Sequence, residues 1–522
     1  MNLDEGGLLP ILPKISYMKK LILLPVFGIF FTLSAQTPDQ SQLETLTEAN
    51  WQKGIQILNE LVSIPNDAYY PEQIEPNIQW CEKAFASRGW SSERLDTGGI
   101  PLLLAEKKQE SATKTALFYF HIDGQAVDRS KWNQDDPYKP TLKEQKADGS
   151  WEIIPMDRLQ AEYNPDWRIY GRSTSDDKGP FAMFLTAWDA LLDQNLAPDY
   201  HIKIILDFEE EQGSPRLPAA VIQYQEKLKA DLMLIMDGPR HTSNLPTLSY
   251  GARGISELFL TTYGPRVPQH SGHYGNYAPN PALLMSQLLA SMKDAEGRVV
   301  IPGFYDGIKL TDSEKAILQA VPDDEFVIKK RLGLGRTDQV GQTYQESIQY
   351  PSLNIRGMKS AWVGPEARTI VPDIAVAELD MRLVPESDPV RLFGLIKEHI
   401  RNQGFYIVEK DPSDEERMNH PKIVKVNTSI SYQAFRTPMD SPTGAWLRKA
   451  MARAFGQEPV QIRISGGSIP ISPFVDALGI PAVTIPTVNA DNNQHSPNEN
   501  IRLGNYKEGI LAILSVLTEP IY

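Results

Sequence analysis

The sequence predicts an α/β protein: a domain with a mostly parallel sheet flanked by helices, plus an inserted smaller α/β domain. Between residues 101 and 236, short apolar runs alternate with helical stretches, as in strand–helix–strand units of a parallel sheet. After residue 246, strand-like runs alternate polar and apolar residues, as half-buried antiparallel strands do. The chain has 522 residues, more than one ordinary core holds, so two domains are expected.

The elements of the first domain follow in chain order. Residues 42–62 have helical periodicity and end before Pro65. The next elements are strands at 101–105, 115–120, 201–208 and 232–236, with helices at 180–192 and 218–228. The chain returns to this domain through a helix at 441–455, a strand at 460–464 and an apolar run at 482–486.

The second domain is expected to be inserted into the first. Its alternating strands are 254–262 and 375–383, and its amphipathic helices are 281–293 and 389–403. We therefore expect a first domain in two parts, 36–245 and 413–522, with a second domain at 246–412 between them.

The first 35 residues have the pattern of a signal peptide. Lys19 and Lys20 precede an apolar run at 21–31, and Leu33-Ser34-Ala35 supplies small residues for cleavage. A membrane anchor is the alternative, but the run is shorter than the ~20 residues a spanning helix needs. We expect an exported protein, periplasmic or secreted, with no membrane span after cleavage; Met1 and Met18 both remain open as its start.

Composition excludes several other classes. The net charge is −14, and no basic stripe offers the face that nucleic-acid binding needs. Cys81 is the only cysteine, so no intrachain disulfide can form, and its setting at 78–85 is that of a packed helical residue.

His121, Glu210, Glu211 and Asp237 follow the ends of predicted strands, where ligands bind in parallel sheets, whereas Asp176 and Asp177 open a helix and His495 lies in a loop. Oxygen and imidazole donors without a thiolate are what two Zn²⁺ ions sharing a water would use in a hydrolase. These residues are His121, Asp123, Asp176, Asp177, Glu210, Glu211, Asp237 and His495. Each motif alone has a structural alternative: a buried His–Asp pair, a helix cap, a solvated acidic face or a loop histidine.

Seven segments in this order resemble the di-zinc metallopeptidase family of carnosinases, cytosolic non-specific dipeptidases, aminoacylases and glutamate carboxypeptidases, and its dipeptidase branch most closely. The resemblance covers residues 42–515 and implies a catalytic α/β domain with an inserted lid. Its segments are Phe120-His121-Ile122-Asp123, 171–179 with Asp176-Asp177-Lys178-Gly179, Glu210-Glu211-Gln212-Gly213-Ser214, His270-Ser271-Gly272, Asp380-Met381-Arg382-Leu383-Val384-Pro385, Gly466-Gly467-Ser468-Ile469-Pro470 and His495-Ser496-Pro497-Asn498-Glu499.

The resemblance implies a role for each metal-site residue. Asp176 would bridge two zinc ions, His121 and Asp237 would complete one site, and Glu211 and His495 the other. Glu210 would be the general base and Asp123 would orient His121. Asp177 follows Asp176 across a peptide bond that is cis in relatives. We expect two Zn²⁺ per subunit, although such oxygen-rich sites also accept Mn²⁺ or Co²⁺.

The resemblance also implies the groups that bind substrate. His270 would reach the active site of a partner subunit and stabilise the tetrahedral oxyanion, which requires a homodimer through the lid domain. Arg382 and Ser468, with Gly467 beside it, would hold the C-terminal carboxylate of the substrate. One departure is Ser173, where relatives usually have glycine; we expect it to have a local effect without loss of metal.

Asp237 indicates the substrate class. Family members with Asp at this position tend to act on substrates with a free α-amino group. We therefore expect a dipeptidase or short-peptide aminopeptidase that uses a zinc-activated water. An N-acyl-amino-acid deacylase or a carboxypeptidase is the alternative within the family, and a non-catalytic peptide-binding protein on the same scaffold is the alternative outside it.

Overall fold

The computed structural model describes residues 37–110, 112–467 and 469–522. Its central element is an eight-stranded sheet in the order β1-β2-β7-β3-β8-β20-β9-β19. β3 pairs in parallel with β7 and β8, and β8 pairs in parallel with β20, whereas β1 and β2 are antiparallel additions at one edge. The strands are β1 (Ser91–Leu95), β2 (Leu102–Lys107), β3 (Thr115–His121), β7 (His201–Asp207), β8 (Leu232–Ile235), β9 (Thr247–Ser249), β19 (Val460–Ile462) and β20 (Ala482–Thr484).

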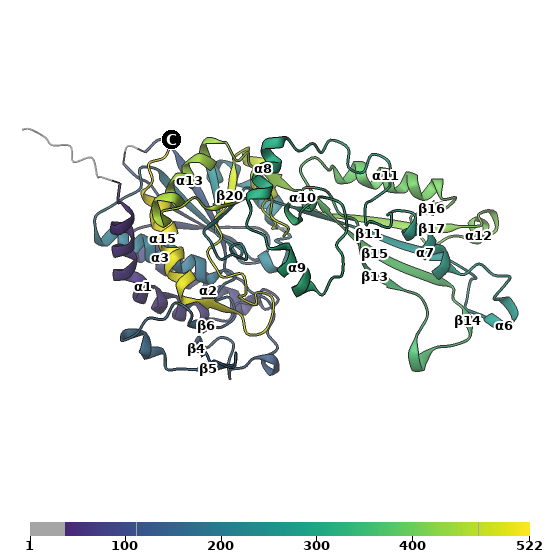
Figure 1. Ribbon diagram of the computed structural model, residues 1–522, viewed down its shortest axis with the longest axis horizontal. Helices are drawn as coiled ribbons and strands as arrows, with labels where there is room; N and C mark the ends of the chain where they lie inside the picture. Colours follow the sequence, from purple (N-terminus) through teal and green to yellow (C-terminus); the bar gives the residue numbers. More distant parts are fainter. Residues whose placement is uncertain (1–36, 111, 468) are drawn as a thin grey trace, which may run out of the picture. The chain divides into compact units, whose positions relative to one another are not determined.

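Alternate residues of these strands enter two separate cores, because successive side chains of a strand point to opposite faces. Phe118 and Phe120 of β3 pack with helices α1, α2, α3, α13 and α15, and Figure 1 shows α1, α3 and α15 lying together. Leu117 and Tyr119 pack with α4, α5 and α14. The helices are α1 (Gln40–Val62), α2 (Pro71–Ser87), α3 (Lys178–Asp193), α4 (Leu217–Gln223), α5 (Gln225–Leu228), α13 (Pro442–Phe455), α14 (Ser472–Leu478) and α15 (Leu503–Thr518).

A five-stranded sheet in the order β13-β15-β11-β17-β16 forms the second half of the fold. The buried residues of β11 and β15 alternate with half-buried ones, and α7 and α11 pack against the buried face. The expected α/β architecture with a lid is confirmed. The elements are β11 (Gly254–Tyr263), α7 (Pro281–Ala290), β13 (Asn354–Lys359), β15 (Ile374–Leu383), α11 (Pro389–Asn402), β16 (Tyr406–Val408) and β17 (Ile423–Tyr432).

The lid sheet does not coincide with the expected range 246–412. β17 pairs with β11 within the lid sheet although it lies beyond residue 412, while β9 belongs to the eight-stranded sheet although it follows residue 246. The second half of β17 is exposed on both sides, so it lacks the polar–apolar alternation that predicted β11 and β15.

A helical segment joins α7 to β13 and contacts both halves of the fold. It contains α8 (Asp312–Ala320), α9 (Glu325–Leu332) and α10 (Tyr344–Ser347). Arg463, just after β19, donates hydrogen bonds to Glu314 of α8 and to Gln349. The sequence analysis did not predict these helices.

A four-stranded sheet, β21-β6-β4-β5, brings two distant loops together. β6 (Arg168–Tyr170) leads into the turn that holds Asp176, and β21 (Asn500–Arg502) follows the loop that holds His495. β4 (Thr141–Gln145) and β5 (Trp151–Ile153) complete it. The remaining short strands and α-helices are β10 (Gly251–Ala252), β12 (Gln269–His270), α6 (Ser271–Tyr274), β14 (Ile370–Val371), α12 (Asp414–Asn419) and β18 (Phe435–Arg436).

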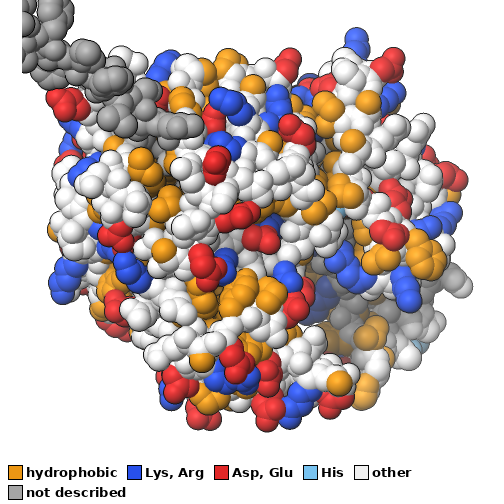
Figure 2. All heavy atoms as spheres, turned by 60° about the vertical axis from the view of Figure 1, so that its left-hand side comes forward, with side chains coloured by type: hydrophobic (Ala, Val, Ile, Leu, Met, Phe, Trp, Pro, Cys, Tyr) orange, Lys and Arg blue, Asp and Glu red, His pale blue; other side chains and the backbone are white. Residues whose placement is uncertain are grey.

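Figure 2 shows basic and acidic side chains interspersed over the face in view, without a continuous basic stripe. The predicted signal peptide, residues 1–35, lies outside the described residues. Within residues 37–522, leaving aside 111 and 468, no helix has both the length and the hydropathy to cross a membrane. Cys81 is fully buried in α2, as expected of a packing residue.

Candidate active site

Three strands and one helix deliver acid and imidazole groups to the same edge of the eight-stranded sheet. His121 is the last residue of β3, and Asp237 follows β8 by two residues. Glu211 lies in η3 (Glu210–Gln212), the 3₁₀ turn after β7. Asp176 lies just before α3, and His495 reaches the site from the loop before β21. This convergence follows from the parallel pairing of β3, β7 and β8, which places their carboxyl ends together.

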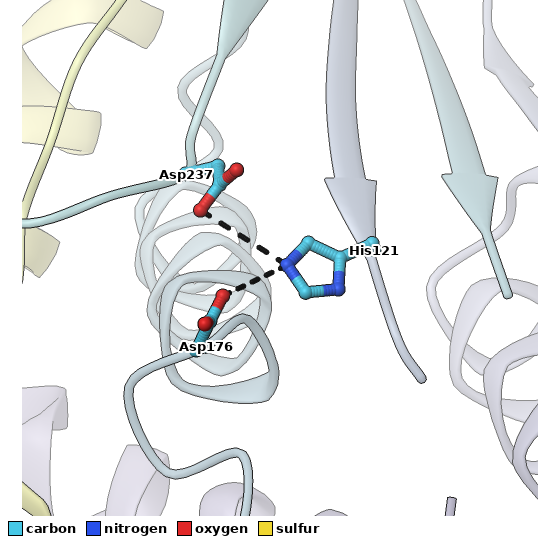
Figure 3. A group of neighbouring side chains, drawn as sticks. All are labelled: His121, Asp176 and Asp237. Atoms are coloured by element: carbon cyan, nitrogen blue, oxygen red, sulfur yellow. Dashed lines mark hydrogen bonds and ion pairs between the residues drawn. The ribbon is translucent and has the colours of Figure 1, made fainter. Parts of the chain in front are cut away.

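The first group is His121, Asp176 and Asp237, all buried (Figure 3). Nε2 of His121 lies 3.0 Å from Oδ1 of Asp176 and 4.0 Å from Oδ1 of Asp237. The second group is Asp176, Glu211 and His495. Nε2 of His495 lies 3.1 Å from Oδ2 of Asp176 and 3.2 Å from Oε2 of Glu211.

Asp176 is common to both groups and presents a different oxygen to each. Its Oδ2 is buried and makes no hydrogen bond with the described residues, although Nε2 of His495 faces it at 3.1 Å. In each group one ligand atom per residue lies within 4.8 Å of the others. Nitrogen and oxygen donors arranged around a shared carboxylate fit a pair of divalent cations, and an orphaned buried carboxylate oxygen is accounted for by such a ligand role.

The electrostatics of the group also fit bound cations. Burial, followed by the charge of Asp176, raises the pKa of Glu211 to about 8 and that of Asp237 to about 6. Burial raises the pKa of Glu210 well above its usual range, and the charges of Asp237 and Glu211 add to this rise. Carboxylates crowded into a buried site resist ionisation unless positive charge offsets them.

Asp123 links His121 to the turn that carries both glutamates. Its Oδ1 lies 3.4 Å from Nδ1 of His121. The same carboxylate accepts hydrogen bonds from the backbone N–H groups of Glu210, at 3.1 Å, and Glu211, at 3.0 Å. Asp123 therefore positions η3 as well as facing the imidazole.

Glu499 has a structural role that the sequence analysis did not assign. It is fully buried and accepts hydrogen bonds from Nη1 of Arg172 at 2.7 Å, from Oγ of Ser175 at 2.9 Å, and from three backbone N–H groups of the turn 173–176. This carboxylate ties the loop of His495 to the turn that presents Asp176. Its position in the segment that resembles the family, four residues after His495, was the only available signal.

Gln125 was also missed. Its Nε2 donates a hydrogen bond of 2.7 Å to Oε2 of Glu211, the same oxygen that faces His495. An amide donor at this oxygen restricts the orientation of the Glu211 carboxylate. A single glutamine two residues after Asp123 carries no pattern from which this role could be predicted.

The turn before α3 has two unusual backbone features. The peptide bond between Asp176 and Asp177 is cis. Ser173 has φ of 63°, in the left-handed region that favours glycine. Its hydroxyl accepts a hydrogen bond of 3.0 Å from Nδ2 of Asn66, and its N–H donates to Glu499.

The two metal-ligand groups open onto a cavity of about 870 Å³. Asp237 and His495 line it, together with Arg382 of β15 and Gly467. Ser468 lies outside the described residues. His270 is not brought to this cavity: it is exposed on the lid between β12 and α6, where its Nδ1 accepts a hydrogen bond of 3.0 Å from the N–H of Gly272.

Known proteins resemble the chain over most of its length. It is 26% identical to the Beta-Ala-His dipeptidase of Homo sapiens over 95% of both chains. It is 25% identical to the Cys-Gly metallodipeptidase dug1 of Schizosaccharomyces pombe over 87% of this chain and 92% of that one. Among solved structures, an M20 family metallo-carboxypeptidase from Sulfolobus solfataricus matches with a TM-score of 0.72 and 27% identity, over 90% of this chain and 99% of that one.

The prediction of an exported, periplasmic or secreted protein is contradicted. These relatives are described as dipeptidases of the Beta-Ala-His and Cys-Gly type, without any mark of export, and the residues on which the prediction rested lie outside the described part of the chain. A charged, apolar and small-residue pattern near a chain start is too short a signal to fix a location. We withdraw that assignment.

The family model for peptidase family M20/M25/M40 matches residues 117–519. This range includes both metal-ligand groups and the lid, and it spans more than half of the chain. The resemblance inferred from the seven segments is thereby confirmed. The chain is a metallopeptidase and belongs to peptidase family M20/M25/M40.

Proposed function

We propose that the chain hydrolyses dipeptides, or short peptides with a free N-terminus, with two zinc ions bound at the two groups that share Asp176. The observation that carries this proposal is the shared carboxylate itself, whose two oxygens lie 3.0 and 3.1 Å from two different histidines. Two relatives that match most of the chain are described as dipeptidases.

His121, Asp176 and Asp237 would hold one cation, and Asp176, Glu211 and His495 the other. When bound, the pair would polarise the scissile carbonyl and lower the pKa of a water at the site. Asp123 keeps the ring of His121 oriented through its Nδ1, as carboxylates beside ligand histidines do. Gln125 and Glu499 hold Glu211 and the Asp176 turn in place.

Glu210 is the proposed general base. It lies beside Glu211, a proposed metal ligand, on η3, and a carboxylate in this position can accept a proton from a water at the metal site. It would take the proton of the attacking water at a carboxylate oxygen and deliver it to the leaving amine. The backbone contact of its N–H with Asp123 fixes the turn from which it acts.

Arg382, Gly467 and Ser468 are proposed to bind the C-terminal carboxylate of the substrate. Arg382 and Gly467 line the same cavity as Asp237 and His495. A carboxylate such as Asp237 also favours a nearby substrate ammonium. His270 of the partner subunit is proposed to stabilise the oxyanion in a homodimer formed through the lid, since His270 of the same chain does not line the cavity.

A carboxypeptidase or deacylase is the second candidate, favoured by the similarity to the Sulfolobus metallo-carboxypeptidase. Amine release from a free dipeptide and from its N-acetylated form, each incubated with the zinc-loaded protein, separates the two. We expect faster turnover of the free dipeptide. Preference for the acetylated form would favour the carboxypeptidase or deacylase. If neither form is hydrolysed, the non-catalytic peptide-binding protein would be favoured.

A further inference from the structure

The cavity extends past the metal-ligand groups to a wall formed by the helical segment between α7 and β13. Ile328, Arg331 and Leu332 of α9 line it, as do Asp323 and Tyr344 on either side of this helix. At about 870 Å³ the cavity is near the upper end of the usual range for small-ligand sites. Room therefore remains beyond the atoms that would contact the metal ions.

Arg331 and Tyr344 present unused polar groups to this space. Arg331 is exposed and makes no hydrogen bond or ion pair with any residue in the described part of the chain. The hydroxyl of Tyr344 likewise has no hydrogen-bond partner among the described residues, and it lies 3.5 Å from where a Cβ on Gly466 would stand. The positive charges of Arg253 and Arg331 act on this hydroxyl, opposing the rise in pKa that burial causes.

Two other charged groups that line the cavity are already engaged. Asp323 accepts hydrogen bonds from Nε2 of His241 at 2.9 Å and from Nε2 of Gln345 at 2.8 Å. Arg240 is buried and paired with Glu508. Among these groups, Arg331 is the cation left without a counter-ion inside the cavity.

We propose that Arg331 and Tyr344 form a subsite for an acidic side chain on the C-terminal residue of the substrate. The assignment to that residue rests on the proposed function, in which Gly467 and Ser468 bind the C-terminal carboxylate; Gly466, beside Tyr344, is the preceding residue. A guanidinium and a phenol together match a carboxylate, which accepts several hydrogen bonds from charged or neutral donors.

A basic residue in the last turn of a helix also stabilises the helix dipole, and Lys329, Lys330 and Arg331 all lie in the last turn of α9. Lys330 lines neither this cavity nor the neighbouring cavity behind α9. It is therefore a matched control: it has the same charge and lies in the same turn of α9, but it has no place in the proposed subsite.

The test compares Ala-Glu with the uncharged, equally large Ala-Gln. We measure kcat/KM with the zinc-loaded wild type, and binding by calorimetry with the zinc-loaded variant Glu210→Gln, which holds uncleaved substrate. We expect Ala-Glu to be preferred about tenfold in both measurements, the effect of one charged hydrogen bond. Equal values for the two dipeptides would overturn the subsite even if both are hydrolysed.

Variants then assign the preference to the residues. Arg331→Gln should abolish the preference for Ala-Glu while leaving turnover of Ala-Leu unchanged, and Tyr344→Phe should reduce it severalfold. Lys330→Gln should keep the preference for Ala-Glu. If Lys330→Gln lost the preference as fully as Arg331→Gln, the preference would come from the general positive charge of α9, and the subsite would be overturned. Absence of turnover for all dipeptides would contradict the proposed function, whereas the binding measurement on Glu210→Gln would still decide the subsite.

Discussion

At the scale of the residue, the site depends on single carboxylates that serve more than one partner. Asp176 faces His121 and His495 with different oxygens. Asp123 faces His121 and accepts hydrogen bonds from the backbone of η3, and Glu499 accepts hydrogen bonds from the turn before α3. A carboxylate has about four lone-pair directions, which allows this sharing. Replacing any of these groups should therefore disturb more than one contact.

Glu210→Gln tests the proposed base. The amide cannot take a proton from water, so kcat should fall at least about a hundredfold while both metal ions stay bound. Turnover of a dipeptide and metal content by elemental analysis check both parts. Glu209→Gln, one residue away and paired with Arg216, serves as the control and should remain close to the wild type in turnover. Near-normal turnover of Glu210→Gln would remove Glu210 from the mechanism.

Glu499→Gln tests the buried link between the two loops. The glutamine amide has one acceptor oxygen and one donor NH₂ where the carboxylate has two acceptor oxygens. The groups that face it, a guanidinium and backbone N–H groups, are all donors, so one of the two positions becomes mismatched. We expect the free energy of unfolding to fall by about 3 kcal/mol, as when a buried ion pair loses one charge. Affinity for metal should fall with it, since the turn of Asp176 loosens.

Urea unfolding of the metal-free protein and a metal titration measure these two effects. Glu162→Gln, which breaks an exposed pair with Arg158, is the control and should cost less than about 1 kcal/mol. A Glu499 variant that unfolds like the control and binds metal normally would show that the link is dispensable.

At the scale of the element, the candidate site depends on which segments end at the same edge of the sheet. The sequence predicted the positions of His121, Glu211 and Asp237 after apolar runs, because buried parallel strands leave a recognisable apolar pattern. β17 was not predicted because half of it is exposed and lacks the alternating pattern of a half-buried strand. The role of Glu499 could not be predicted, because most of the groups that donate hydrogen bonds to it are backbone N–H groups more than 320 residues away in the chain. Such groups leave no pattern in the sequence.

The small sheet that joins the two loops offers a test by pH. Nζ of Lys143 on β4 is buried, donates to the carbonyl of Asn133 at 3.0 Å and lies 4.3 Å from the ring centre of Tyr170. Burial lowers the pKa of Lys143 to about 8. The unfolded value is about 10.4, so the charged lysine costs stability below pH about 8, and this cost disappears as pH rises toward about 10.

Lys143→Met carries no such charge. Its free energy of unfolding relative to the wild type should therefore decrease as pH rises from about 7.5 to about 9.5. The slope should approach that expected when the folded and unfolded states differ by one bound proton. Parallel denaturation curves across this range measure the difference. A difference that is constant with pH would mean that Lys143 is solvated in the folded protein.

At the scale of the whole molecule, the lid has two proposed tasks. Arg382 of β15 lines the cavity of its own chain, whereas His270 is exposed elsewhere on the lid. A symmetric dimer would place the His270 of each chain at the site of its partner. Two inactive variants should then complement each other.

Mixing His270→Ala with Glu210→Gln, after exchange of subunits, tests this directly. In the mixed dimer, one site has Glu210 from one chain and His270 from the other, so about a quarter of wild-type activity should return. His270→Ala alone should lose turnover while retaining metal. If the mixture stays inactive although mixed dimers form, or if His270→Ala loses zinc, the proposed role of the lid histidine is wrong.

The central claim is that one carboxylate, Asp176, organises two metal ions for peptide hydrolysis. It is tested most directly by titrating the metal-free protein with Zn²⁺ while following both bound metal and hydrolysis of a free dipeptide. The account predicts that activity saturates at two zinc ions per chain in the wild type, and that Asp176→Ala loses high-affinity binding of both. Saturation at a single zinc ion, or full activity of Asp176→Ala, would contradict it.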